Sequence, residues 1–272
     1  MKTTEQESNY TGLEEMSVND LLEGINAEDH TVPAAVQKAI PQIAEVVEAI
    51  TGRMKQGGRV FYMGAGTSGR IGILDASEIP PTYGVSDRFI GIIAGGDYAI
   101  RNAKEGAEDN YSQGAEDFLA FAPDRNDTLI GITASGGAPY VLGALDAARA
   151  LGAFTSCITC NECSPVAEMS DVAITVIVGP EFVTGSTRMK AGTATKLILN
   201  MISTAVMIRL GHVKGNKMVD MQLTNLKLVD RGTRMIMDET GIEDYEQAKS
   251  LLLEHGSVRN AVNSLKRAPA GE

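Results

Sequence analysis

Tryptophan is absent from this 272-residue chain, and only 5% of its residues are aromatic. A protein that stacks nucleic-acid bases needs aromatic side chains on its surface, so this composition argues against that role. Positive charge is also scarce, because 24 lysines and arginines stand against 35 aspartates and glutamates, a formal net charge of −11. No basic cluster interrupts this excess, so we expect neither nucleic acid nor an anionic membrane as a partner.

Long apolar runs are missing as well. No stretch of the chain approaches the roughly 18 consecutive apolar residues that a membrane-spanning helix needs. The first eight residues are polar and acidic, which is not typical of a signal peptide. We therefore expect a cytoplasmic protein. Its length and its 43% hydrophobic content suffice for one large domain with a sizeable core.

Cysteine occurs only three times, at Cys157, Cys160 and Cys163. This C-x-x-C-x-x-C spacing raises the possibility of an iron–sulfur or zinc site. Such a site normally takes four ligands, but the chain has no fourth cysteine and its three histidines are scattered. Cys157 also lies inside a predicted strand. We therefore expect small buried side chains rather than a metal site or a disulfide framework.

A glycine-rich turn at residues 63–70, MGAGTSGR, is the feature around which the chain is organised. The apolar run 60–63 before it predicts a buried strand, and residues 71–76 after it predict a helix. Glycines let a ligand approach the backbone, hydroxyls add donors, and the free N–H groups at a helix start favour an anion. The turn is therefore a candidate phosphate cradle. Its candidate binding residues are Gly66, Thr67, Ser68 and Gly69.

The same glycines match the G-x-G-x-x-G spacing of dinucleotide-binding proteins. That fingerprint also wants an acid about 20 residues further on, at the end of the second strand, to bind a ribose. Asp87 has roughly that spacing but precedes the next predicted strand, and Asp97 lies too far along. A nucleotide-dependent oxidoreductase is therefore a weaker alternative. A P-loop does not fit, because no Gly-Lys-Ser/Thr follows.

Five β-rich runs alternate with helical patterns, which predicts an α/β protein with a doubly wound, five-stranded parallel sheet of flavodoxin-like order. The expected strands are 59–63, 89–94, 128–133, 154–158 and 172–178. The expected helices between them are 69–78, 97–121, 138–151 and 164–169. In the order 2-1-3-4-5, ligands bind beyond the carboxyl ends of strands one and three, where the strand order reverses.

The loop after the third expected strand, residues 134–139, has the sequence ASGGAP. Like the first cradle, it is rich in glycine, carries a hydroxyl and opens a helix. Two such loops at the predicted ligand site are a stronger signal than either alone. Ser135 and Gly136 therefore join the candidate phosphate ligands.

We predict a flexible arm over residues 1–16, a phosphate-binding α/β domain with N-terminal helices over 17–216, and a C-terminal helical region over 217–272. Within the second segment, a long helix over 186–210 starts with hydroxyls and basic side chains. Ser186 and Lys190 are candidate anion ligands there. A solvated face, or ion pairs with the excess carboxylates, is an equally weighted alternative for the basic residues.

Several long motifs resemble those of the N-acetylmuramic acid 6-phosphate etherases, which belong to the sugar isomerase (SIS) domain superfamily. These motifs occupy residues 64–70, 74–84, 93–96, 105–109, 179–181 and 184–193, and the resemblance covers about residues 19–230. It implies cleavage of the D-lactyl ether of N-acetylmuramic acid 6-phosphate, which gives N-acetylglucosamine 6-phosphate and D-lactate in bacterial cell-wall recycling. It also implies a homodimer with the active site at the subunit interface, and neither a metal nor an organic cofactor.

The two catalytic glutamates of that family map to Glu78 and Glu108. Elimination of the lactyl group needs a base for the C2 proton and an acid for the leaving oxygen, and two carboxyl groups can serve. On the resemblance, we assign Glu108 as the base, and Glu78 as the acid that later helps water to add. Glu105 would share a helix face with Glu108 if the expected helix 97–121 continues through both, and would then either support Glu108 or contact the sugar.

Glu78 stands ten residues beyond Ser68. Along a continuous helix this is ~15 Å, which exceeds the length of a hexose phosphate. We therefore expect either that the helix breaks early or that Glu78 serves the site of the other subunit.

The chain departs from the family pattern in two places. Gly137 and Ala138 stand where these etherases often carry arginine and threonine, so Ser186, Thr187 or Lys190 would have to compensate. The C-terminal region also looks shorter than is usual in the family. A sugar-phosphate-sensing regulator of the glucokinase regulatory protein type and a sugar-phosphate isomerase are the alternatives. The single SIS unit and the two glutamates favour the etherase over the regulator.

Overall fold

The computed structural model describes residues 3–267 of the chain. Its internal contacts divide it into two units. The first unit comprises the chain up to Ser77 together with Asp87–Val206, and the second comprises Glu78–Ser86 together with the chain from Met207 onward.

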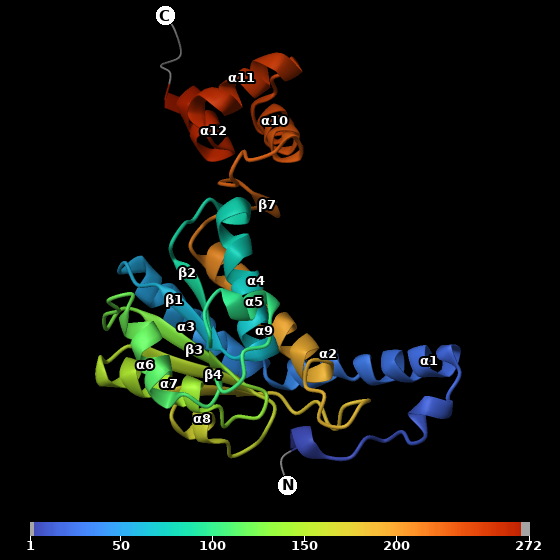
Figure 1. Cartoon of the computed structure of the whole chain (residues 1–272). Helices are drawn as coiled ribbons and strands as arrows, with labels where there is room; N and C mark the ends of the chain where they lie inside the picture. Colours follow the sequence, from blue (N-terminus) through green and yellow to red (C-terminus); the bar gives the residue numbers. More distant parts are fainter. Residues whose placement is uncertain (1–2, 268–272) are drawn as a thin grey trace, which may run out of the picture. The chain divides into compact units, whose positions relative to one another are not determined.

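Within the described part of the first unit, five parallel strands form one sheet in the order β2-β1-β3-β4-β5 (Figure 1). The strands are β1 Val60–Gly64, β2 Phe89–Ile93, β3 Thr128–Ile132, β4 Phe154–Thr159 and β5 Val172–Thr175. Every residue of β1 and β3 is buried, as expected for strands covered on both faces. The predicted fold class and strand order are confirmed.

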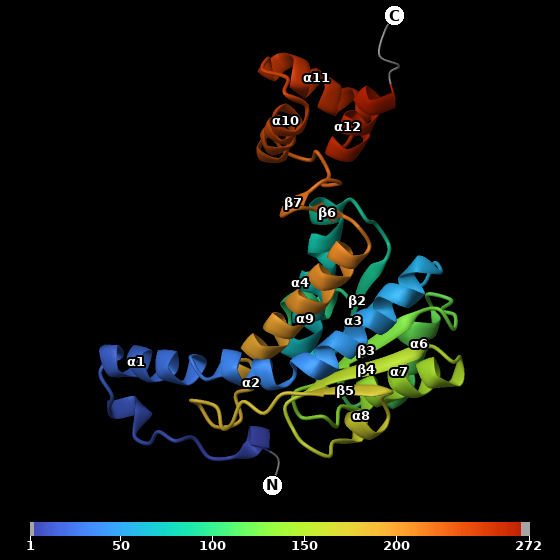
Figure 2. The same cartoon turned by 180° about the vertical axis from the view of Figure 1, so that it is seen from behind.

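Helices cover both faces of this sheet. Figures 1 and 2 show α3 (Ile40–Lys55) on one face and α6 (Tyr111–Leu119), α7 (Pro139–Ala150) and α8 (Pro165–Glu168) on the other. Two further helices, α1 (Val18–Asp29) and α2 (Val32–Lys38), precede α3. Ser17 caps α1, because its side chain accepts a hydrogen bond from the N–H of Asp20. Pro41 lies in the first turn of α3, a position at which a helix tolerates proline.

The first described residues form two short 3-10 turns, Thr3–Glu5 and Leu13–Glu15. Thr4 is buried, and the side-chain amide of Asn161 donates to its hydroxyl at 2.9 Å. The segment that we predicted to be a flexible arm is thus hydrogen-bonded to the loop after β4.

The expected helix over 97–121 is wrong. The structure has a single turn of helix, α5 (Tyr98–Arg101), then a loop over 102–110, and then α6. The loop is polar and exposed, and Gly106 adopts a left-handed φ of 69°. Without an apolar face to bury, this segment gains nothing from helix formation, and Asn110 caps α6 instead.

Helix α4 (Gly66–Tyr83) begins in the first unit directly after β1 and contains Pro80 and Pro81 in its last turn. It was expected to span only 69–78. The helix continues past Glu78, so the structure does not show the early break that the sequence left open.

Helix α9 (Lys190–Arg209) starts four residues later than expected, because residues 186–189 form a turn. Its 20 residues and its mean hydropathy of 1.3 would suffice, by length and composition, to cross a membrane, and 56% of its apolar window is buried in the protein. A core helix has the same composition, and Ile198, Leu199 and Ile202 are completely buried here. We therefore regard α9 as a core helix.

The described part of the second unit contains a small hairpin and three helices of its own. The hairpin strands are β6 Val213–Lys214 and β7 Lys217–Met218, and the helices are α10 Leu226–Thr240, α11 Tyr245–His255 and α12 Val258–Arg267. The region expected to be helical starts at residue 217, but its first helix, α10, begins only at Leu226, because Asn225 caps it by accepting the N–H of Leu228. The helices enclose their own apolar core, built around Met235, Ile236 and Leu252.

Candidate active site

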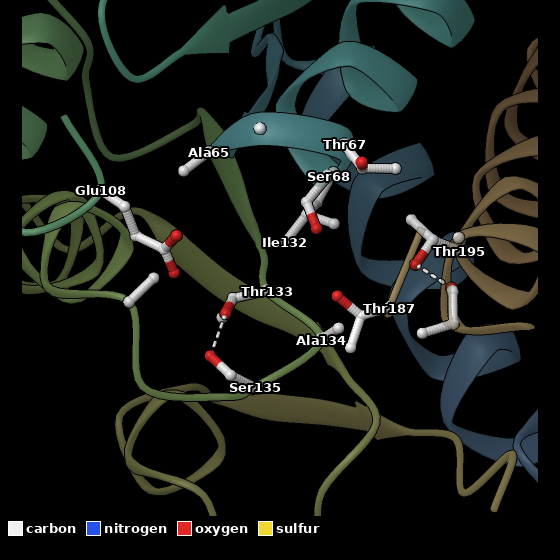
Figure 3. Close-up of a pocket in the computed structure, with 14 residues that line it drawn as sticks. Ala65, Thr67, Ser68, Glu108, Ile132, Thr133, Ala134, Ser135, Thr187 and Thr195 are labelled. Carbon is white, nitrogen blue, oxygen red and sulfur yellow. Dashed lines mark hydrogen bonds between the residues drawn. The ribbon is translucent and has the colours of Figure 1, made fainter. Parts of the chain in front are cut away.

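A cavity of about 160 Å³ lies in the first unit at the carboxyl ends of β1 and β3, where the strand order reverses (Figure 3). This is the position at which doubly wound sheets bind ligands. Four segments line it: the β1–α4 turn, the loop before α6, the β3–α7 loop and the start of α9. The lining residues are Ala65, Gly66, Thr67, Ser68, Glu108, Ile132, Thr133, Ala134, Ser135, Ala138, Thr187, Ala191, Gly192 and Thr195.

The β1–α4 turn supplies backbone donors as well as hydroxyls. Gly66 opens α4 with a left-handed φ of 54°, and an added Cβ would meet no atom within 4 Å. Gly66, Thr67 and Ser68 occupy the first turn of α4, where N–H groups have no partner within the helix. Thr67 and Ser68 extend their hydroxyls into the same space. This part of the predicted cradle can therefore hold an anion.

Gly69 has a different task. It is buried, and a Cβ there would lie 2.6 Å from the carbonyl oxygen of Gly64 and 2.6 Å from a side-chain carbon of Ile93. Its N–H donates to the carbonyl of Ala65. Gly69 thus permits the close packing of α4 on the sheet, and it does not line the cavity.

The β3–α7 loop faces the first cradle across the cavity. The hydroxyls of Thr133 and Ser135 lie 3.1 Å apart, and both point into the cavity (Figure 3). Gly136 has a φ of 72°, and a Cβ on it would lie 2.3 Å from the side chain of Ser164. Gly136 therefore shapes this loop, while Ser135 presents a hydroxyl. Thr133 was not predicted as a site residue. Its position at the end of the expected third strand, directly before the predicted ligand loop, could have pointed to it.

The start of α9 closes the cavity with Thr187, Ala191, Gly192 and Thr195. Thr187 was expected only as a substitute ligand, and Thr195 was not expected at the site. Thr195 could have been found from the sequence, because it lies four residues after Ala191 and therefore shares a helix face with it, in a segment of small residues.

Lys190 and Ser186 do not line the cavity. Lys190 is buried, and its Nζ lies 2.5 Å from Oε2 of Glu28 on α1. Burial raises the pKa of the Glu28 carboxyl, but the hydrogen bonds from Lys190 and Asn9 outweigh this effect and leave the pKa lowered. Of the two alternatives for Lys190, the structure has the ion pair. Ser186 is half-buried in the turn before α9, where its N–H donates to Val183.

Among the described residues that line the cavity, none is a lysine, arginine or histidine, and Glu108 is the only carboxylate. An anionic group in this cavity would therefore be held by hydroxyls and backbone N–H groups. Glu108 is exposed, and Figure 3 shows its carboxylate pointing into the same space as the hydroxyls of Thr133 and Ser135.

Glu105 lies apart from Glu108. Both residues sit in the loop over 102–110 rather than on one helix face, so that expectation is wrong. Glu105 lines a neighbouring cavity of about 630 Å³ beside β2 and α6, together with Lys104 and Gln113. Glu78 is exposed and belongs to the second unit. The two proposed catalytic carboxylates thus come from different units of the chain.

The cysteines occupy unlike environments. Cys157 and Cys160 are buried and Cys163 is exposed, and all three are free. Burial raises the pKa of Cys157 to about 11 and that of Cys160 to about 12. Among the described residues, no group of three or more histidines, cysteines, aspartates or glutamates is arranged to hold a metal ion.

Two family models match the chain. One is described as the glucokinase regulatory protein N-terminal SIS domain and matches residues 42–149, and the other is the SIS domain, which matches residues 116–205. The N-acetylmuramic acid 6-phosphate etherase of Bacteroides fragilis is 60% identical over 267 residues, which cover 98% of this chain and 95% of that protein. The chain belongs to the N-acetylmuramic acid 6-phosphate etherase family.

Other members of the etherase family match over similar lengths. The etherase of Porphyromonas gingivalis is 60% identical over 269 residues, covering 98% of both chains. The N-acetylmuramic acid 6-phosphate etherase 2 of Vibrio cholerae is 51% identical over 249 residues, covering 91% of this chain and 81% of that protein. The chain thus spans nearly the whole length of the first two relatives and about four fifths of the third.

Solved structures share the fold of this etherase-family chain. A phosphoheptose isomerase from Francisella tularensis superimposes with a TM-score of 0.51 at 20% identity, covering 68% of this chain and 97% of that one. The phosphoheptose isomerase of Neisseria gonorrhoeae gives a TM-score of 0.51 at 16% identity, covering 70% and 98%. Such low identities establish the common fold only.

Proposed function

We propose that this enzyme cleaves the D-lactyl ether of N-acetylmuramic acid 6-phosphate, yielding N-acetylglucosamine 6-phosphate and D-lactate in cell-wall recycling. The observation that carries the proposal is the 60% identity, over 98% of the chain, to relatives named as etherases for this compound. The cavity adds independent support, because it combines a candidate phosphate cradle with the carboxylate of Glu108.

The phosphate is held at the start of α4. Gly66, Thr67 and Ser68 supply N–H groups and hydroxyls from one side, and Ser135 supplies a hydroxyl from the other. Thr133 and Thr187 also line the cavity. In this proposal their hydroxyls replace the one that is missing at Ala138. Gly69 and Gly136 act by allowing the two loops to pack, and Lys190 and Ser186 act outside the cavity.

The chemistry starts from the open-chain sugar, in which the C1 aldehyde acidifies the proton on C2. A base removes this proton, the electron pair forms a C2–C3 double bond, and the C3–O bond breaks while an acid protonates the leaving lactyl oxygen. Water then adds to C3, and C2 takes up a proton. The sum consumes one water molecule and involves no net oxidation or reduction, so the proposed reaction requires no redox cofactor.

We assign Glu108 as the base for the C2 proton and Glu78 as the acid for the lactyl oxygen. Glu108 lines the cavity beside the phosphate cradle. Glu78 lies on α4, which runs from the cradle through Glu78 to Tyr83. Ten residues of helix span about 15 Å, more than a hexose phosphate. We therefore propose a homodimer in which Glu78 of one subunit completes the active site of the other.

Glu105 serves as a secondary contact in this proposal, because it lies three residues before Glu108 in the same loop and faces the adjoining cavity. We place the reaction in the cytoplasm. Three free cysteines, two of them buried, fit a reducing compartment.

The decisive experiment is to incubate the purified protein with N-acetylmuramic acid 6-phosphate and a metal chelator, and to measure D-lactate. Release of D-lactate is expected and would support a reaction that needs no removable metal. The match to the glucokinase regulatory protein SIS model favours a second candidate, a sugar-phosphate sensor. Thermal stabilisation by the sugar phosphate without D-lactate release would favour the sensor. Interconversion of aldose and ketose phosphates would favour an isomerase.

A further inference from the structure

The loop over 102–110 carries Glu108 yet has almost no apolar attachment to the protein. In this fully described segment, Ala107 is the only residue that is even partly buried. A catalytic carboxylate must be held within a fraction of an ångström of its working position. Since packing does not fix this loop, hydrogen bonds must do so.

The end of the loop is attached to α7. The N–H of Tyr140, in the first turn of α7, donates to the carbonyl of Glu108 at 2.9 Å. Tyr140 is completely buried, and its hydroxyl donates to Asp117 on α6 at 2.6 Å. The backbone of Glu108 is thus tied to the helix that follows the loop of Ser135.

The beginning of the loop is attached to α4 by Arg70. The Nε of Arg70 donates to the carbonyl of Ile100 at 2.8 Å, and its Nη2 donates to the carbonyl of Asn102 at 3.2 Å. These carbonyls belong to the last turn of α5 and to the residue after it, where helical partners are lacking. A planar guanidinium can serve both at once, whereas a lysine ammonium has no fixed fork of donors.

We propose that Arg70 is a positioning residue, which couples the phosphate cradle to the loop that carries Glu108. Arg70 lies two residues after Ser68 on the same helix and does not line the cavity. The helix that holds the phosphate therefore also fixes the start of the catalytic loop, so that phosphate and base keep their separation. This inference rests on the proposed function, because it takes Glu108 to be the base.

The test compares Arg70→Ala, Arg70→Lys and a matched control. Arg88 is the control, because it too donates a guanidinium hydrogen bond to a backbone carbonyl, that of Met54, but at the opposite, amino end of β2. We expect Arg70→Ala to lower kcat by at least about 10-fold, since small displacements of a reacting group are costly. KM and the dissociation constant for N-acetylglucosamine 6-phosphate should change less than about 3-fold, because the cradle is intact.

Arg70→Lys keeps the charge and should recover only part of kcat, and Arg88→Ala should leave kcat within about 2-fold of wild type. Hydrogen–deuterium exchange should accelerate over residues 102–109 in Arg70→Ala and remain unchanged over α7. If Arg70→Ala does not fold, Arg70→Lys carries the same test.

An unchanged kcat in the Arg70 variants would overturn the proposal. So would a weakening of N-acetylglucosamine 6-phosphate binding by the same factor as the loss of kcat. Absence of D-lactate release by the wild-type protein would instead refute the proposed function. In that case the exchange experiment still decides whether Arg70 fixes the loop.

Discussion

Glu108 is a single carboxylate in a cavity otherwise lined by hydroxyl-bearing residues, small residues and Ile132. Since no described lysine, arginine or histidine lines that space, no fixed cation is there to pair with it. A carboxylate on an exposed loop usually has no role beyond solubility. Here its direction, towards Thr133 and Ser135, sets it apart from Glu105, which lies three residues away.

Glu108→Gln removes the proposed base while keeping its size, so kcat for D-lactate release should fall about 10²–10⁴-fold. KM should change little. Ser68→Ala is the contrasting variant and should raise KM by about 10-fold, because a hydrogen bond to a charged phosphate is lost. Steady-state kinetics separate the two, and near-wild-type turnover by Glu108→Gln would refute the assignment.

The start of α9 contributes small and hydroxyl-bearing residues to the cavity lining, whereas its charged residue Lys190 does not line the cavity. Glu181 is 1% exposed, and its carboxylate accepts the N–H groups of Lys190 at 2.8 Å and Ala191 at 3.0 Å. The positive end of α9 is therefore already occupied by an anion of the protein. The ion pair between Lys190 and Glu28 fixes the same turn. This leaves the start of α4 as the helix end at which we propose that the phosphate binds.

This arrangement predicts that Glu181→Ala damages binding as well as stability. Losing the cap should lower the free energy of unfolding by about 1–2 kcal/mol. Because Ala191 and Gly192 line the cavity, KM should also rise severalfold. Asp244→Ala is the matched control, since Asp244 caps α11 by accepting the N–H of Gln247 in the second unit. It should cost similar stability in thermal unfolding and leave KM unchanged. Equal KM values for both variants would contradict this role.

At the scale of the whole molecule, the proposed homodimer divides the two glutamates between chains. Glu78 is on a helix that continues without interruption from the cradle, and it belongs to a different unit from Glu108. A symmetric dimer would then contain two composite sites, each built from both subunits.

Coexpression of Glu78→Gln and Glu108→Gln chains tests this arrangement. Each variant alone should be nearly inactive. In a mixed dimer, one site receives both intact glutamates and the other receives neither. Random pairing should therefore restore roughly a quarter of wild-type activity. Activity that stays at the level of the single variants would place both glutamates in one chain, and a monomer in sedimentation would exclude the dimer.

The sequence determined the parts of this protein that depend on local patterning. Alternation of apolar runs and helical segments predicted the five parallel strands and their order, because β-rich runs between helices have few other solutions. The same topology predicted that the two glycine-rich loops lie close together, since the carboxyl ends of parallel strands meet at one edge of the sheet. Thr67, Ser68 and Ser135 accordingly line the cavity as expected.

Contacts between distant segments settled the roles that local patterning left open. Lys190 was expected equally as an anion ligand or in an ion pair, and its burial against Glu28, 162 residues away, decided for the pair. Glu105 and Glu108 were expected on one helix face, but the exposed loop directs them into separate cavities. Arg70 and Glu181 act on backbone groups of other elements, which no spacing in the sequence reveals, because such partners are brought together only by folding.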